Sequence, residues 1–229
     1  MKAASLFSGG KDSIYAMYLA EKQGIKVEDL VCLIPSFPSP SPHAENIAAL
    51  KILAEAMKKS LTIVDFHKGK EEFVKVLKNL NVDTLVAGDI FLEEHVSWLE
   101  KTCGRAGVDL LEPIFGRKTS DLFHEIFNSG FKALIIGVDV RYLGEKWLGF
   151  TLSTETANTF LVETEDVDPL GENGEYHTLV IECPLYPNSF KIKSSKKIIV
   201  KDLRYLITSV YPSSETLLGQ SKSVDVSRQ

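Results

Sequence analysis

The chain contains little cysteine. Three of its 229 residues are cysteines, Cys32, Cys103 and Cys183, and none of them forms a Cys-x-x-Cys pair. An odd number of widely spaced cysteines excludes a disulfide framework and argues against a zinc site. Because free cysteines are typical of a reducing compartment, we expect a cytoplasmic protein.

Long apolar runs and an excess of basic residues are also missing. The longest apolar stretches, such as residues 133–138, are far too short to cross a bilayer. The strand predicted directly after Lys2 leaves no signal peptide. The net charge is −5, from 26 Lys and Arg against 31 Asp and Glu, which excludes a broad basic surface for nucleic acid. We therefore expect neither a membrane nor a nucleic acid as a direct partner.

Short apolar runs alternate with helical patterns through the first half of the chain. This alternation predicts an α/β fold with a parallel sheet, right-handed crossovers and helices on both faces. In such a sheet the ligand lies at the carboxyl ends of the strands. The strands are predicted at 3–7, 30–34, 61–64, 84–87 and 109–111, and the helices at 14–23, 46–57, 71–80 and 93–106.

The rhythm changes after about residue 120. A helix is predicted at 121–128 and strands at 133–138, 178–181 and 197–200, but glycine and proline turns become frequent. We therefore predict two domains, residues 1–120 and a smaller α+β domain at 121–229. The Pro/Ser segment 36–42 and the polar tail from Pro212 are expected to be loosely ordered.

A glycine-containing loop, Ser8-Gly9-Gly10-Lys11-Asp12-Ser13, lies between the first predicted strand and the first predicted helix. The glycines allow a tight turn and a close approach of the backbone to an anion. Unpaired helical N–H groups, the helix dipole, two hydroxyls and a lysine would all favour negative charge there. The loop therefore predicts a phosphate site.

The loop matches neither the Walker A pattern, because Asp12 follows the lysine, nor G-x-G-x-x-G. It closely resembles the PP-loop of the ATP pyrophosphatase superfamily. That resemblance implies a Rossmann-like core of the HUP type and cleavage of ATP between its α- and β-phosphates. Asp12 could then be a Mg²⁺ ligand or simply an acid in the first helical turn. Asp89 could bind metal or a nucleotide hydroxyl, or cap a helix.

A second polar run, Gly171-Glu172-Asn173-Gly174-Glu175-Tyr176-His177-Thr178, places two carboxylates, an amide, a tyrosine, a histidine and a threonine within eight positions. Together with the first loop it resembles the diphthine–ammonia ligase family, for which this run is a hallmark. His43 with Asn46, Gly88-Asp89-Ile90 and Glu100 with Cys103 match further pieces in order. The resemblance covers roughly residues 2–187 and is to the short archaeal form.

The resemblance implies ATP-dependent amidation of diphthine on translation elongation factor 2, through an acyl-adenylate, with release of AMP and pyrophosphate. The expected cofactors are ATP and Mg²⁺, and the expected partners are the elongation factor and ammonium. Since the chain has no room for a glutaminase domain, nitrogen would come from free ammonium or a partner enzyme. A homo-oligomer stays open.

The implied site divides into three groups of residues. For catalysis these are Lys11, Glu175 and His177, with His177 either accepting a proton from ammonium or only shaping the site. For ATP they are Ser8, Gly9, Gly10, Lys11, Asp12, Ser13, His43, Gly88 and Asp89. For the substrate they are Glu172, Asn173, Glu175, Tyr176, His177 and Thr178, where the carboxylates could meet a trimethylammonium group, Mg²⁺ or ammonia and Tyr176 could add a cation–π contact.

Three other readings stay open at this point. The chain could be an ATP pyrophosphatase acting on another carboxylate or on tRNA, although tRNA thiolation normally needs the missing Cys-x-x-Cys pair. It could also be an ATP-binding module that forms no AMP.

The remaining histidines, His67, His95 and His124, are assigned to the surface or to helices.

Overall fold

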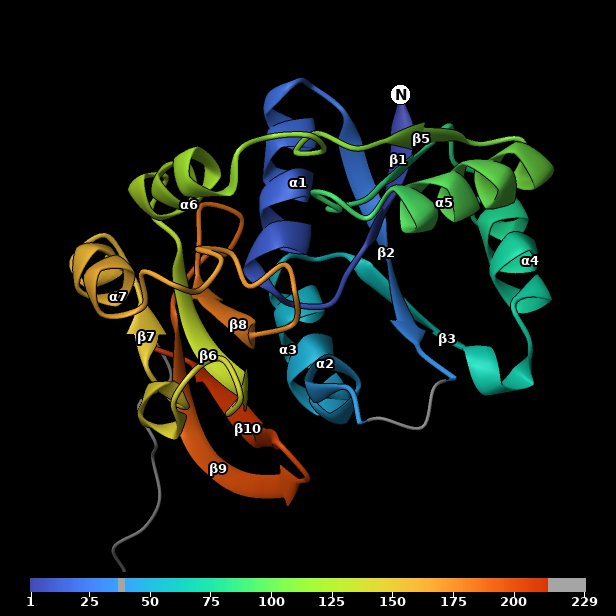
Figure 1. Cartoon of the computed structure of the whole chain (residues 1–229). Coiled ribbons are helices and arrows are strands. Elements are labelled where there is room, and N and C mark those ends of the chain that lie inside the picture. Colours follow the sequence, from blue (N-terminus) through green and yellow to red (C-terminus); the bar gives the residue numbers. More distant parts are fainter. Residues whose placement is uncertain (37–39, 214–229) are drawn as a thin grey trace, which may run out of the picture.

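The computed structural model describes residues 1–36 and 40–213, which form two five-stranded sheets side by side (Figure 1). The first sheet belongs to the N-terminal half and the second to the C-terminal half. Within the described residues, no helix is long and apolar enough to cross a membrane. Residues 37–39 of the Pro/Ser segment and residues 214–229 of the tail lie outside the described chain.

The first sheet is entirely parallel, with the strand order β3-β2-β1-β4-β5. The chain thus builds outward from β1 to β3 and then crosses to the other side of β1, which leaves a switch point between β1 and β4. This topology confirms the predicted Rossmann-like α/β fold. The strands are β1 (Lys2–Leu6), β2 (Lys26–Ile34), β3 (Ser60–Asp65), β4 (Thr84–Val86) and β5 (Asp109–Leu111).

Helices cover both faces of this sheet because the strand side chains alternate. Ala3 belongs to the apolar cluster that includes Met17 and Leu50, whereas its neighbour Ala4 belongs to the cluster that includes Phe73 and Leu99. The helices are α1 (Lys11–Lys22), α2 (Pro42–Glu45), α3 (Ile47–Ala56), α4 (Glu71–Leu80) and α5 (Glu93–Ala106), with a short η1 (Phe66–Lys68).

The second sheet is antiparallel, with the order β7-β6-β10-β9 and β8 paired to β6. This antiparallel sheet with its own helices confirms the α+β character predicted for the C-terminal part. Its elements are α6 (Thr119–Asn128), β6 (Lys132–Asp139), η2 (Glu145–Trp147), β7 (Thr151–Leu152), α7 (Ala157–Glu163), β8 (Tyr176–Glu182), β9 (Phe190–Val200) and β10 (Leu203–Pro212).

The prediction of this half was incomplete. The strand predicted at 197–200 begins at Phe190, and β10 and α7 were not predicted at all. Most of β9 is exposed, so it lacks an alternating apolar pattern, and its backbone pairing with β10 defines it instead. Pro212, the start of the predicted tail, ends β10.

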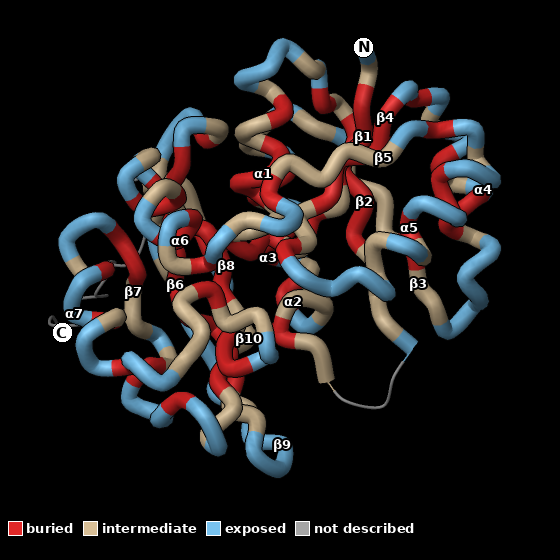
Figure 2. Tube along the Cα trace, turned by 45° about the horizontal axis from the view of Figure 1, so that its top comes forward, coloured by how far each residue is buried: buried red, intermediate tan, exposed pale blue. Residues whose placement is uncertain are grey.

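The two sheets share one packed interior. The larger apolar cluster joins Ile14 and Leu50 of the first half to Ile135 and Leu179 of the second, and Figure 2 shows the buried parts of α1, α3, β6 and β8 next to one another. Asn46 adds a polar link, because its side chain donates to the Leu206 carbonyl (2.8 Å) and accepts from the Thr208 N–H (2.7 Å).

Candidate active site

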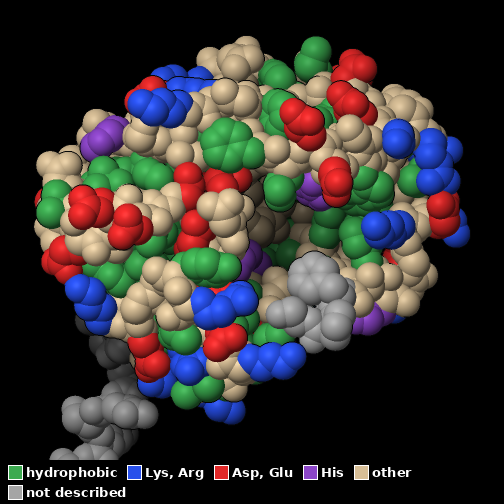
Figure 3. All heavy atoms as spheres, viewed as in Figure 1, with side chains coloured by type: hydrophobic (Ala, Val, Ile, Leu, Met, Phe, Trp, Pro, Cys, Tyr) green, Lys and Arg blue, Asp and Glu red, His purple; other side chains and the backbone are tan. Residues whose placement is uncertain are grey.

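A cavity of about 350 Å³ lies between the two halves. Its walls come from the carboxyl ends of β1 and β2, from the loop after β4 and from residues 170–178 before and within β8. This is the carboxyl edge of the parallel sheet next to its switch point, where ligands of doubly wound folds bind. Figure 3 shows the hollow between the halves, with acidic side chains on its rim.

The phosphate loop lies on the floor of this cavity. Gly9 has a φ of +75°, and Gly10 is the N-cap of α1 and has no side chain of its own to cap the helix. The hydroxyls of Ser8 and Ser13 lie 3.1 Å apart, and Ser8 Oγ accepts from the Gly10 N–H. The start of α1 thus faces the cavity with hydroxyls and free backbone N–H groups, which suits an anion.

Two glycines of this region have no room for a side chain. A Cβ on Gly9 would lie 2.4 Å from Leu50 Cδ2, and one on Gly88 would lie 2.8 Å from the Asp12 carbonyl oxygen. Gly88 therefore lets the loop after β4 pack directly on the first turn of α1. The Gly-Asp pair was noticed in the sequence, and this contact gives its glycine a physical reason.

Lys11 is almost completely buried, with 2% of its surface exposed. Its ammonium donates to the Leu170 carbonyl (2.5 Å) and to Asp12 Oδ2 (3.0 Å), and it lies 4.8 Å from the centre of the Tyr176 ring. The lysine therefore places its charge where the phosphate loop meets the second motif. Tyr176 turns its face toward Lys11, and its hydroxyl donates to the Pro169 carbonyl.

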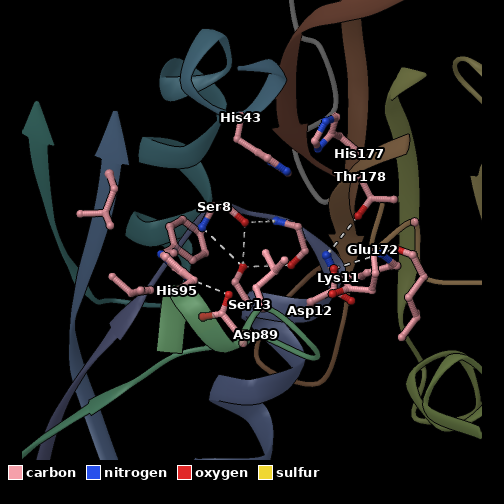
Figure 4. Close-up of a pocket in the computed structure, with 18 of the residues that line it drawn as sticks. Ser8, Lys11, Asp12, Ser13, His43, Asp89, His95, Glu172, His177 and Thr178 are labelled. Carbon is pink, nitrogen blue, oxygen red and sulfur yellow. Dashed lines mark hydrogen bonds and ion pairs between the residues drawn. The ribbon is translucent and has the colours of Figure 1, made fainter. Parts of the chain in front are cut away.

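The second motif packs directly on the phosphate loop. The Lys11 N–H donates to Thr178 Oγ1 (3.1 Å), and the Val180 N–H donates to the Gly9 carbonyl (2.9 Å). Figure 4 shows Thr178 and Glu172 next to Lys11. Two motifs that lie more than 150 residues apart in the sequence therefore form one site.

Glu175 turns away from the cavity and into its own loop. It is 5% exposed, and its oxygens accept from the Asn173 N–H (2.9 Å), from Asn173 Nδ2 (2.9 Å) and from the Asp168 N–H (3.4 Å). Asp168 was not predicted; it accepts from the N–H groups of Leu170 and Glu172. Both carboxylates hold the loop in shape, and neither Glu175 nor Asn173 lines the cavity.

Glu172 and Asp12 do line the cavity, and the charge of Asp12 disfavours that of Glu172. Burial, followed by the charge of Asp12, raises the pKa of Glu172 to about 7, and burial also raises the pKa of Asp12. Asp12 Oδ1 is buried and has no hydrogen-bond partner in the part of the chain that the structure describes. Within the described residues, no group of three or more His, Cys, Asp and Glu side chains is placed to hold a metal by itself.

His43 and His177 meet edge to face on another wall, with ring centres 5.3 Å apart (Figure 4). Burial lowers the pKa of His43 to about 3 and that of His177 to about 4, so both rings are neutral at pH 7. His43 Nδ1 is buried and finds no hydrogen-bond partner within residues 1–36 and 40–213. Both rings line the cavity, as the sequence suggested for their positions.

Asp89 lines the cavity, and it makes a contact that the sequence did not suggest. Its Oδ1 lies 2.7 Å from Nδ1 of His95, and its N–H donates to Glu112 Oε2 (3.2 Å). His95 lies in helix α5, as predicted, and it also lines the cavity. Its position in the first turn of α5 carries no local motif, so only the fold brings it to the site.

The chain matches two family models, one described as "Diphthamide synthase N-terminal domain" over residues 1–110 and one as "Diphthamide synthase C-terminal domain" over residues 118–210. Among similar curated proteins, the diphthine–ammonia ligase of Homo sapiens is 28% identical over 230 residues, covering 87% of this chain and 85% of that protein. The Mus musculus enzyme is 25% identical over 228 residues, with the same two shares.

Two solved structures are similar at low TM-scores. A predicted subunit of tRNA methyltransferase from Methanocaldococcus jannaschii has a TM-score of 0.42 at 16% identity, covering 80% of this chain and 98% of that chain. The U34-tRNA thiolase NcsA of Methanococcus maripaludis has a TM-score of 0.35 at 18% identity, covering 56% of each chain. At these scores neither likeness bears on the activity.

Proposed function

Because the chain belongs to the diphthamide synthase family, we propose that it uses ATP to join ammonium to the carboxylate of diphthine on translation elongation factor 2. The products would be diphthamide, AMP and pyrophosphate. The observation that carries this proposal is that the phosphate loop and the 171–178 motif form one cavity, joined by the Lys11–Thr178 and Val180–Gly9 hydrogen bonds. With a translation factor as substrate, the reaction would take place in the cytoplasm.

The phosphate loop would hold the triphosphate through its β- and γ-phosphates. The free N–H groups at the start of α1 and the hydroxyls of Ser8 and Ser13 offer donors, and Lys11 adds positive charge at the edge of the loop. A diphthine carboxylate oxygen would attack the α-phosphorus, and the bond to the β-phosphate oxygen would break. The site then supplies charge neutralisation and alignment for this step.

The residues fit a Mg²⁺ ion that arrives with ATP. Asp12 has one buried oxygen without a partner among the described residues, and its neighbour Glu172 would gain from a nearby cation because their two charges repel. Mg²⁺ is commonly held by one or two carboxylates together with substrate phosphates, and residues 1–36 and 40–213 supply no complete cage of His, Cys, Asp and Glu side chains. When bound, the ion would neutralise phosphate charge, with Asp12 as its ligand from this chain.

The second motif would then divide into cavity residues and support residues. Glu172, His177 and Thr178 line the cavity and would meet the modified histidine or the nitrogen donor. Asn173 and Glu175 would act by fixing the loop, given their mutual hydrogen bonds. We thus assign nucleotide binding to residues 1–120 and most substrate contacts to residues 121–229.

The test is to incubate the protein with ATP, Mg²⁺, ammonium and diphthine-bearing elongation factor 2. AMP release and the acid-to-amide mass change of the factor are followed together, with the unmodified factor as the control. Formation of both products would support the proposal. AMP without amide would point to another carboxylate, and ATP binding without AMP would point to a binding module.

A further inference from the structure

The loop after β4 and the first turns of α5 build a histidine–carboxylate pair on the cavity wall. Asp89 Oδ1 lies 2.7 Å from His95 Nδ1. Because a carboxylate accepts hydrogen bonds, Nδ1 is the donor and the neutral ring keeps its lone pair on Nε2. Figure 4 shows this pair on the opposite side of Ser8 and Ser13 from Glu172 and Thr178.

Glu112, which follows β5, supports the pair from behind. Its Oε2 accepts the Asp89 N–H, while its Oε1 is buried without a partner among the described residues. Burial, followed by the charge of Asp89, raises the pKa of Glu112 to about 8. The ring of His95 also stacks on the ring of Trp98, with the ring centres 5.3 Å apart. The hydrogen bond to Asp89 and this stacking together fix the orientation of the His95 ring.

The charged groups that face His95 come from three elements. Asp89 and Glu112 favour its protonated form, and Lys70 before α4 disfavours it; the hydrogen bond to Asp89 dominates and raises the pKa of His95. The other two histidines of the cavity, His43 and His177, have no such carboxylate partner and have lowered pKa values. His95 is therefore the strongest histidine base on the cavity wall.

We propose that His95 is a catalytic residue that takes the proton from the incoming ammonium ion, and that Asp89 and Glu112 are positioning residues for it. This inference rests on the proposed function and names the base of its second step. It assigns the proton acceptor to the side of the cavity opposite His177. The carboxylate of Asp89, which lines the cavity, would also attract a cation rather than a phosphate.

The step balances without any further reactant. Ammonium gives one proton to His95 Nε2 and becomes ammonia, whose lone pair forms a bond to the acyl carbon of the acyl-adenylate. The bond from that carbon to the phosphate oxygen breaks, and AMP leaves with the electron pair. The nitrogen then loses one more proton to water to give the neutral amide, and His95 returns its proton to water.

His95→Gln tests the proposal with two nitrogen nucleophiles. At pH 7 we expect amide formation from ammonium to fall about 100-fold, the usual effect of losing a general base. Hydroxylamine already has an unprotonated nitrogen at neutral pH, so hydroxamate formation should fall less than about threefold. ATP–pyrophosphate exchange in the presence of the diphthine-bearing factor reports the first step and should be largely retained. The ammonium defect should also shrink at alkaline pH, where free ammonia becomes abundant.

His67→Gln is the matched control, because His67 forms the same kind of pair with Asp65 (2.9 Å) on the exposed surface outside the cavity. It should leave both nucleophiles unaffected. Asp89→Asn should lower the pKa of His95 and move the rise of ammonium-dependent activity to lower pH. Equal losses with ammonium and hydroxylamine, or no loss in His95→Gln, would overturn the proposal. If the wild-type protein forms AMP but no amide, the proposed function fails, and this inference fails with it.

Discussion

The two loops that meet in the cavity obtain their shape in opposite ways. In the phosphate loop, glycines and the start of α1 leave backbone N–H groups free, and the serine hydroxyls bond mainly within the loop. In the loop that leads into β8, the carboxylates of Asp168 and Glu175 accept hydrogen bonds from the backbone N–H groups of the loop. The first loop therefore offers donors to a ligand, whereas the second uses its own acceptors for rigidity and leaves Glu172 to face the cavity. A polar motif can thus contain both working and supporting side chains of the same chemical type.

The largest effect is expected from Gly9→Ala, which attacks the backbone on which the first loop depends. An alanine at a φ of +75° is strained by about 1–3 kcal/mol, and its Cβ would also collide with Leu50. We expect loss of ATP binding by calorimetry and a clearly lowered melting temperature. Gly24 has a similar φ of +83°, and a Cβ added there would meet no described atom within 4 Å. Gly24→Ala should therefore lower stability without abolishing ATP binding. Equal ATP affinity in the two variants would contradict the role of Gly9 in bringing the backbone close to the phosphates.

Lys11→Ala removes the cation at the junction of the two loops. We expect AMP formation to fall by at least about 100-fold, the scale of losing one charge-stabilising group, while circular dichroism shows a folded protein. Lys59→Ala is the control, because Lys59 is a partly buried lysine that bonds Glu21 (2.5 Å) and does not line the cavity. Unchanged turnover in Lys11→Ala would remove this lysine from the mechanism.

Glu175→Gln tests the supporting role in the second loop. The variant keeps the shape of the side chain but loses one acceptor for the Asn173 donors, which should cost about 1–3 kcal/mol of unfolding free energy. Chemical denaturation measures this loss directly. If activity vanishes while stability is unchanged, Glu175 has a chemical role that its buried position does not suggest.

Glu172→Gln should have the smallest effect on stability, and its sign depends on pH. The folded protein raises the pKa of Glu172 to about 7 from an ordinary 4.5, so the native state binds more protons than the unfolded state between these values. Stability contributed by this group therefore falls as pH rises from about 4.5 to 7. The variant removes that fall and should be about 1 kcal/mol more stable than the wild type at pH 8, after solvent screening, but not at pH 4. Thermal melts at the two pH values check this difference.

Much of the first half could be predicted because its signals are local. Apolar strands covered on both faces, helices with apolar stripes and a glycine turn before a helix all show in short windows of sequence. Strand β9 could not be predicted from its residues, because its exposed, lysine-rich side chains carry no apolar pattern and its pairing partner β10 supplies the order. The place of His95 in the cavity could not be predicted either. Its contact with Asp89 depends on how the loop after β4 folds against α5.

By itself the sequence determined the parallel fold and the phosphate loop, because glycine conformations, helix termini and apolar periodicity act within a few residues. Only the tertiary structure decided which polar residues face the cavity. Lys11 finds its acceptor at Leu170, 159 residues away, and Glu172 and Glu175 separate into a cavity wall and a loop support although they lie three positions apart. The physical reason is that a buried charge needs a specific partner, and the folded chain fixes where that partner lies.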